Sequence, residues 1–208
     1  MHLLSALQSR YSTKVFDPTK KLSDNQLFEL TEALRLSASS YGLQPWKFLV
    51  ITNPELRKTM QAHAWNQAQV TEASHLIAIL SKTSVDAAYV DTYIDLIVKE
   101  RGVDRSTLQH YRTMMLGAIA AKTPREVQEW SMRQAYIALG TLLTSAAVLG
   151  IDACPMEGFV REDIDTDLGL KNSGWTTTLL CPVGFRGDDV YATKKKVRFD
   201  RDIVIEQR

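Results

Sequence analysis

The sequence has few of the residues that bind metals or form disulfides. Of its 208 residues only two are cysteine and four are histidine. None of them has the CxxC or HxxxH spacing typical of a metal site, so we expect no bound metal. Cys154 and Cys181 fit a compartment that keeps thiols reduced. Residues 1–10 lack the long apolar core of a signal peptide, and we therefore expect a cytoplasmic protein.

An excess of charge of one sign is also lacking. The 25 lysine and arginine residues nearly balance the 24 aspartate and glutamate residues, and the two signs are interspersed along the chain. Such a surface has no field of one sign that would attract nucleic acid or an anionic membrane. We expect a small-molecule partner, and neither nucleic acid nor a membrane.

Long apolar runs are missing as well. Residues 135–151 contain no charged residue, but as a helix rising 1.5 Å per residue they would cover about 26 Å, less than the roughly 30 Å of a bilayer core. A helix that is apolar all round crosses the middle of a core or packs against a second subunit. The segment therefore predicts a long central helix.

The common motifs of nucleotide binding and acyl transfer are absent. The chain has no GxGxxG or Walker loop, and no GxSxG elbow carries a nucleophile. With no metal, nucleophile or acid–base pair evident, a cofactor would have to supply the reactive centre if this is an enzyme.

Local signals predict the elements of an α+β fold. Ser23 and Gln26 form a capping-box pattern before an apolar stripe that ends near Ala38, and residues 123–126 (TPRE) mark the start of a long helix to Gly150. The other predicted elements are helices over 90–102 and 108–119 and strands over 47–52, 75–81, 176–185 and 203–205. Strands and helices do not alternate regularly, so a doubly wound sheet is not expected. We predict one domain over residues 1–208.

Two basic segments lie at opposite ends of the chain, 10–14 (RYSTK) and 194–198 (KKKVR). A phosphate needs several fixed donors at once, and Arg, Lys and Ser from distant segments can converge to supply them. Each segment alone also fits a solvated face or the cationic end of a helix. Two turn-rich segments, 39–46 and 154–159, lie between them. Together the four segments predict one cofactor pocket.

In order and spacing these segments resemble the FMN-dependent nitroreductase family, from about residue 3 to residue 200. The sequence is most similar to the oxygen-insensitive NAD(P)H nitroreductase and dihydropteridine reductase type. The resemblance implies a nitroreductase-like α+β fold, with a small mixed, mostly antiparallel sheet surrounded by helices, in an intertwined homodimer. It also implies FMN as cofactor, NAD(P)H as co-substrate and ping-pong, two-electron reduction of nitroaromatics, quinones or related acceptors.

The resemblance assigns roles to residues of this chain. Arg10, Ser12, Lys196 and Arg198 would hold the FMN phosphate, with Tyr11 beside them. Lys14 would approach the pyrimidine end of the flavin, where a cation stabilises the negative charge gained on reduction. The residues implied to contact the flavin ring are Asn66, Gln69, Pro155, Met156, Glu157 and Gly158.

Other implied contacts involve the second subunit or the substrate. Ser39 and Ser40 would contact the flavin bound mainly by the partner. Tyr41, Met115 and Leu116 are predicted to bind substrate, although a helical core stripe explains Met115 and Leu116 better. Residues 85–122, which form a lid in relatives, match the family poorly.

The sequence departs from the family pattern at Gln69, where relatives often have a second lysine. The flavin potential and the choice between NADH and NADPH therefore stay open. Two alternatives also remain open, a flavin-dependent dehalogenase or other enzyme of the same superfamily, and a flavin-binding protein without catalysis.

Overall fold

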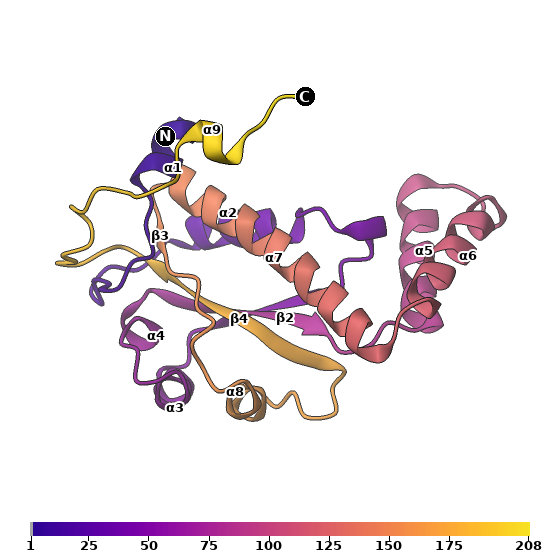
Figure 1. Cartoon of the computed structure of the whole chain (residues 1–208). Helices are drawn as coiled ribbons and strands as arrows, with labels where there is room; N and C mark the ends of the chain where they lie inside the picture. Colours follow the sequence, from indigo (N-terminus) through magenta and orange to yellow (C-terminus); the bar gives the residue numbers. More distant parts are fainter. Residues whose placement is uncertain (1) are drawn as a thin grey trace.

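A sheet of four antiparallel strands, in the order β1-β2-β4-β3, lies at the centre of the molecule (Figure 1). The computed structural model describes residues 2–208. The strands are β1 (Trp46–Ile51), β2 (His75–Lys82), β3 (Asp152–Ala153) and β4 (Trp175–Gly184). Trp46 of β1 pairs with Ser81 of β2, and Ile77 of β2 pairs with Cys181 of β4. The predicted strands over 47–52, 75–81 and 176–185 are thus confirmed.

Helices cover both faces of this sheet. Their bounds are α1 (Leu3–Ser9), α2 (Asp24–Arg35), α3 (Pro54–His63), α4 (Gln69–Glu72), α5 (Ala87–Arg101), α6 (Gln109–Ala120), α7 (Pro124–Val148), α8 (Arg161–Asp167) and α9 (Arg201–Val204), with 3-10 turns at η1 (Ser40–Gly42) and η2 (Arg105–Leu108). Helices α2 and α7 pack on one face, and α3, α4 and α8 on the other (Figure 1). Because both faces are covered, β2 and β4 are buried along nearly their whole length.

The sequence signals for helix ends agree closely with the structure. The side-chain oxygen of Ser23 accepts from the Gln26 N–H, and that of Thr123 accepts from the Glu126 N–H, so both capping boxes are confirmed. Gly102 ends α5 with a φ of +63°, a conformation that favours glycine. These helix ends could be predicted from the sequence because each signal depends only on residues a few positions apart.

The predicted strand over 203–205 is wrong, because residues 201–204 form the single helical turn α9. Isolated β-branched residues favour a strand, but a strand needs a neighbour to satisfy its backbone groups. In α9 those groups bond locally, from the Ile203 N–H to the Asp200 carbonyl and from the Ile205 N–H to the Arg201 carbonyl.

The long helix α7 is confirmed, but it is buried on one side only. Ala138, Leu142 and Ala146 pack against the sheet and have no exposed surface. On the other side Tyr136 and Ile137 are 39% and 46% exposed. The helix therefore lies on the sheet and leaves an apolar face uncovered. No helix within residues 2–208 is long and apolar enough to cross a membrane.

Helices α5 and α6 form a lobe that stands apart from the sheet (Figure 1). Val90, Ile94 and Met115 form its apolar centre. On its surface the Asp91 carboxylate accepts hydrogen bonds from Arg112 at 2.6 and 2.8 Å. The lobe lies within residues 85–122.

Arg57 of α3 is a buried cation that fastens α3 to the C-terminal end of α4. Its guanidinium donates to the carbonyl oxygens of Val70 at 2.8 Å, Ala73 at 2.6 Å and Ser74 at 3.2 Å. Burial lowers the pKa of Arg57, and the three carbonyls compensate for the water that the cation has lost.

Replacing Arg57 with Met is expected to lower the free energy of unfolding by about 3 kcal/mol, because buried carbonyls lose their donor. Urea unfolding followed by circular dichroism measures this. The matched control is Lys58→Met on the same helix, where the side chain is exposed and we expect a change below about 0.5 kcal/mol. Equal losses in the two variants would contradict this role for Arg57.

Candidate functional site

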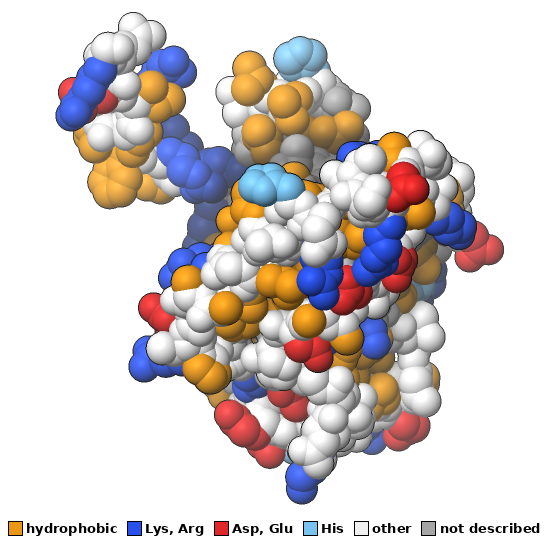
Figure 2. All heavy atoms as spheres, turned by 90° about the vertical axis from the view of Figure 1, so that its right-hand side faces the viewer, with side chains coloured by type: hydrophobic (Ala, Val, Ile, Leu, Met, Phe, Trp, Pro, Cys, Tyr) orange, Lys and Arg blue, Asp and Glu red, His pale blue; other side chains and the backbone are white. Residues whose placement is uncertain are grey.

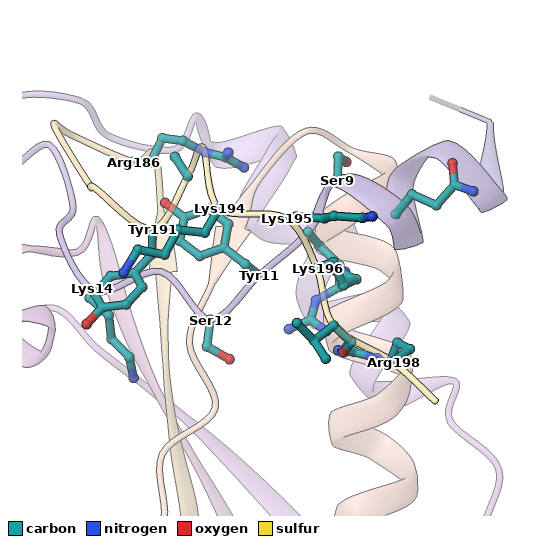
Figure 3. Close-up of a pocket in the computed structure, with 14 residues that line it drawn as sticks. Ser9, Tyr11, Ser12, Lys14, Arg186, Tyr191, Lys194, Lys195, Lys196 and Arg198 are labelled. Carbon is teal, nitrogen blue, oxygen red and sulfur yellow. The ribbon is translucent and has the colours of Figure 1, made fainter. Parts of the chain in front are cut away.

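The two ends of the chain meet at a cavity of about 510 Å³ (Figure 3). Its wall contains the predicted basic residues from both ends of the sequence. The lining residues are Gln8, Ser9, Arg10, Tyr11, Ser12, Lys14, Arg186, Tyr191, Ala192, Lys194, Lys195, Lys196, Val197 and Arg198. The cavity therefore brings together the two basic segments, but not the segments 39–46 and 154–159 that were predicted to share the pocket.

Backbone hydrogen bonds hold the two ends side by side. The Asp17 N–H donates to the Phe185 carbonyl at 2.8 Å, and the Gly187 N–H donates to the Val15 carbonyl at 3.0 Å. On the other edge of the same segment, Ser12 forms a bridge with Ala153 of β3. The segment before Asp17 is thus fixed between β3 and the start of the C-terminal segment.

The cavity wall carries seven cationic side chains and no carboxylate. Burial lowers the pKa of Arg10, and the charge of Arg198 lowers it further. The pKa of Lys196 is lowered by burial and then by the charges of Arg10 and Arg198. Cations that depress one another's pKa gain stability when an anion binds among them. The wall is therefore suited to an anion of high charge, such as a phosphate group.

Three residues of the cavity region were not recognised in the sequence. Arg186 pairs with Asp152, its Nε lying 2.9 Å from Oδ1, and stacks over the Tyr11 ring at 4.8 Å. Tyr191 lines the wall, and Asp189 lies buried behind it. No local pattern distinguishes these residues, because their roles depend on contacts with the other end of the chain.

Lys14 connects the cavity with the segment 154–159. Its Nζ lies 3.6 Å from the Sγ of Cys154. Burial raises the pKa of the Cys154 thiol, while Lys14 and a hydrogen bond with Gln69 act in the opposite direction. Lys14, Cys154 and Gln69 thus lie together.

The turn at Gly158 packs closely against the segment after α3. The Gln67 amide donates to the Gly158 carbonyl at 2.8 Å. A Cβ on residue 158 would lie 2.7 Å from the Trp65 ring, so only glycine fits there without movement. Trp65 and Asn66 have positive φ angles of 55° and 56°. The structure therefore brings Asn66 and Gly158 into the same neighbourhood.

The rest of this turn is also firmly held. Met156 exchanges backbone hydrogen bonds with Leu180 of β4 at 2.8 and 3.0 Å, which fixes Pro155 and Met156 on the sheet. The Tyr136 hydroxyl donates to the Glu157 carboxylate at 2.5 Å. Burial, followed by this hydrogen bond, raises the pKa of Tyr136 to about 12. The Glu157 carboxylate therefore already has a partner.

Like Asn66, Gln69 and the segment 155–158, the remaining predicted site residues do not line the cavity. The Ser40 N–H donates to Gln134 at 2.8 Å, and the Tyr41 carbonyl accepts from Tyr111 at 2.7 Å. Ser39 accepts from the Gln44 N–H. Met115 has no exposed surface, so within one chain it belongs to the core of the lobe and cannot contact substrate. Leu116 packs against the same core.

Comparisons with known proteins agree on one family. The family model described as the nitroreductase family matches residues 7–185. A Bacillus subtilis protein named "Putative NAD(P)H nitroreductase YfkO" is 36% identical over 198 residues, which cover 90% of each chain. Lys196 and Arg198 lie outside residues 7–185, which the family model matches. The two solved structures described next cover 100% of this chain and so include both residues.

Solved structures show the same fold. A structure named "putative NAD(P)H:FMN oxidoreductase" from Staphylococcus epidermidis has a TM-score of 0.87 at 20% identity, covering 100% of this chain and 96% of that one. A "putative nitroreductase in complex with FMN" from Exiguobacterium sibiricum has a TM-score of 0.85 at 21% identity, covering 100% and 98%.

Inorganic phosphate at constant ionic strength is expected to raise the Tm of the protein, because it binds the folded cavity. At ten times its dissociation constant the stabilisation is about 1.4 kcal/mol. Arg198→Gln should lose most of this response. Arg201→Gln, which removes an exposed cation of α9 outside the cavity wall, serves as the control. Equal responses in both variants would contradict the role of Arg198 in binding an anion at this cavity.

Proposed function

Because the chain belongs to the nitroreductase family, we propose that it is an FMN-dependent NAD(P)H oxidoreductase that reduces nitroaromatics, quinones or related acceptors by two electrons. The observation that carries the proposal is the convergence of seven cations on one cavity, from which Lys14 reaches Cys154 at the start of the segment 154–159. The relative named as an NAD(P)H nitroreductase and the FMN-bound structural neighbour support it.

The cation cluster fits the phosphate of FMN. A phosphate monoester carries between about 1.5 and 2 negative charges at neutral pH. In this proposal Arg10, Ser12, Lys196 and Arg198 hold it, since two arginines and a lysine balance that charge and the hydroxyl adds a donor. Lys196 also donates to the Leu7 carbonyl at 2.6 Å, which ties the C-terminal segment to α1.

The neighbouring residues fit the flavin ring. The FMN would supply the hydride-accepting centre, and the chain supplies its surroundings. Lys14 offers a positive charge at the pyrimidine end, Asn66 offers an amide donor and acceptor, and the turn at Gly158 offers a backbone N–H. Because Tyr136 already binds the Glu157 carboxylate, we assign no proton transfer to Glu157. Water delivers the proton to the product.

We propose ping-pong turnover, in which NAD(P)H and the acceptor use the same flavin face in turn. The sequence has no Gly-rich loop of the kind that builds a separate dinucleotide site. A single accessible face of the flavin would have to serve both substrates, so the donor would leave before the acceptor binds.

We also propose that the protein is a homodimer, because large apolar side chains are exposed both on α7 and on the C-terminal segment. Hydrophobic side chains gather on the protruding segment at the upper left of Figure 2, which is the C-terminal end of the chain. Phe199 and Ile203 there are 79% and 69% exposed, and Ile137 on α7 is 46% exposed. Ser39 and Ser40 lie outside this chain's cavity, as expected if they serve the partner's flavin.

The visible spectrum of the purified protein tests the function. A yellow protein that is bleached by anaerobic NADPH or NADH and recovers on addition of a quinone is the expected result. A colourless protein that takes up no added FMN would contradict the proposal. A yellow protein that neither nucleotide bleaches would favour a binding protein without catalysis.

Arg198→Ala is expected to weaken FMN binding by about 10- to 100-fold, because a charged hydrogen bond to the phosphate is lost. Quenching of FMN fluorescence on titration measures the dissociation constant. Riboflavin, which has no phosphate, should bind the variant and the wild type alike. An unchanged FMN affinity would argue against the phosphate assignment.

A charge placed on the uncovered face of α7 should dissociate the dimer. Ile137→Arg is expected to sediment as a monomer of about 23 kDa, because the arginine would lose its water in the interface. Thr166→Arg on α8, which packs on the other face of the sheet, is the control and should sediment like the wild type. If the wild type itself sediments as a monomer, the dimer proposal fails.

A further inference from the structure

Asp189 is a buried carboxylate directly behind the cavity wall. Its exposed fraction is 5%, yet it accepts hydrogen bonds on both oxygens. Its Oδ2 accepts from the Lys14 N–H at 2.7 Å, the Val15 N–H at 3.2 Å and the Tyr11 hydroxyl at 3.0 Å. Its Oδ1 accepts from the Tyr191 N–H at 2.9 Å.

These four bonds account for the ionised state of a carboxylate that has little contact with water. Burial alone would raise the pKa of Asp189, but the N–H groups of Tyr191, Lys14 and Val15, together with the Tyr11 hydroxyl, lower it below its usual value. Asp189 is therefore charged at neutral pH. A buried charge with several donors holds those donors in a fixed geometry.

The donors come from both halves of the site. Lys14 is fixed at its backbone by Asp189, while its ammonium extends to Cys154 at 3.6 Å. Tyr11 lines the cavity and lies under Arg186 at 4.8 Å. Tyr191 begins the stretch that leads to the basic run 194–198. Asp189 thus links the residue proposed for the flavin ring with the segment proposed for the phosphate.

We propose that Asp189 is a positioning residue of the FMN site, which sets the place of the Lys14 ammonium beside the flavin and the separation of the two basic segments around the phosphate. The inference rests on the proposed function. Asp189 does not line the cavity, so it acts through Lys14, Tyr11 and Tyr191.

Positioning and direct charge have effects of opposite sign. Asp189 is negative, so as a simple charge it would oppose both the phosphate and the reduced flavin, and its removal would tighten FMN binding and raise the midpoint potential. As a positioning residue it places cations that favour both, and its removal would weaken binding and lower the potential. The sign of the change therefore separates the two roles.

The test replaces Asp189 with Asn in the full chain. The asparagine has nearly the same size but has only one acceptor oxygen and no charge, so its NH₂ group must face either the Tyr191 N–H or the donors of residues 11–15, and the remaining hydrogen bonds are weaker. The expected result is an FMN dissociation constant higher by about tenfold or more, from the loss of charge-assisted hydrogen bonds, and a lower midpoint potential of the flavin at saturating FMN. Asp188→Asn, which removes the exposed neighbouring carboxylate, is the matched control and should change neither property appreciably.

The double variant Asp189→Asn with Lys14→Met shows whether Asp189 acts on the flavin potential through Lys14. Lys14→Met should lower the potential in the wild type, but should lower it less when Asp189→Asn is already present. Purely structural damage would lower the Tm of the variant and leave the potential of the flavin that it binds unchanged. Full additivity of the two substitutions would likewise overturn the proposal.

The remaining outcomes are also decisive. Unchanged or tighter FMN binding by Asp189→Asn, or an unchanged or higher potential, would overturn the positioning role while leaving the proposed function intact. Failure of the wild type to bind FMN would instead overturn the proposed function. If Asp189→Asn does not fold, Asp189→Glu, which keeps the charge and displaces the carboxylate, replaces it. The same loss of affinity and potential is expected, and wild-type values would overturn the proposal.

Discussion

The candidate site depends on holding like charges together. Arg10, Lys196 and Arg198 repel one another, and after burial this repulsion is the next cause that lowers the pKa values of Arg10 and Lys196. Without support from the backbone, these three side chains would move apart. What keeps them close is the backbone pairing of residues 15–17 with 185–187 and the buried Asp189 beyond it. The folding free energy of the sheet and its helices thus offsets the repulsion among these cations. An anion bound among them would reduce that repulsion.

The sheet determines where this pairing occurs. Strand β4 lies between β2 and β3, so the chain leaves β4 at Gly184 next to β3. The segment around Ser12 pairs with Ala153 of β3 at this side of the sheet, and the turn that leads to Gly158 begins directly after Ala153. Helix α7 covers one face and leaves its own outer side apolar and exposed. The same few elements therefore position the phosphate residues, the turn at Gly158 and the surface proposed for a partner.

Local signals explain what the sequence could predict. The capping boxes at Ser23 and Thr123, the three longer strands and the convergence of the two basic segments were all predictable, the last through the resemblance of motifs along the chain. Asp189, Arg57 and Trp65 were not, because each owes its role to partners distant in sequence. The error at residues 203–205 has the same origin, since no local pattern shows whether a strand finds a neighbour.

The contact between Lys196 and Leu7 spans 189 positions of the sequence. Bringing such distant segments together costs chain entropy before any contact between them is gained, so contacts of this kind form late in folding. The cation cluster is therefore a property of the fully folded domain, and any opening of the C-terminal segment would disperse the cluster while the sheet and its helices stay intact.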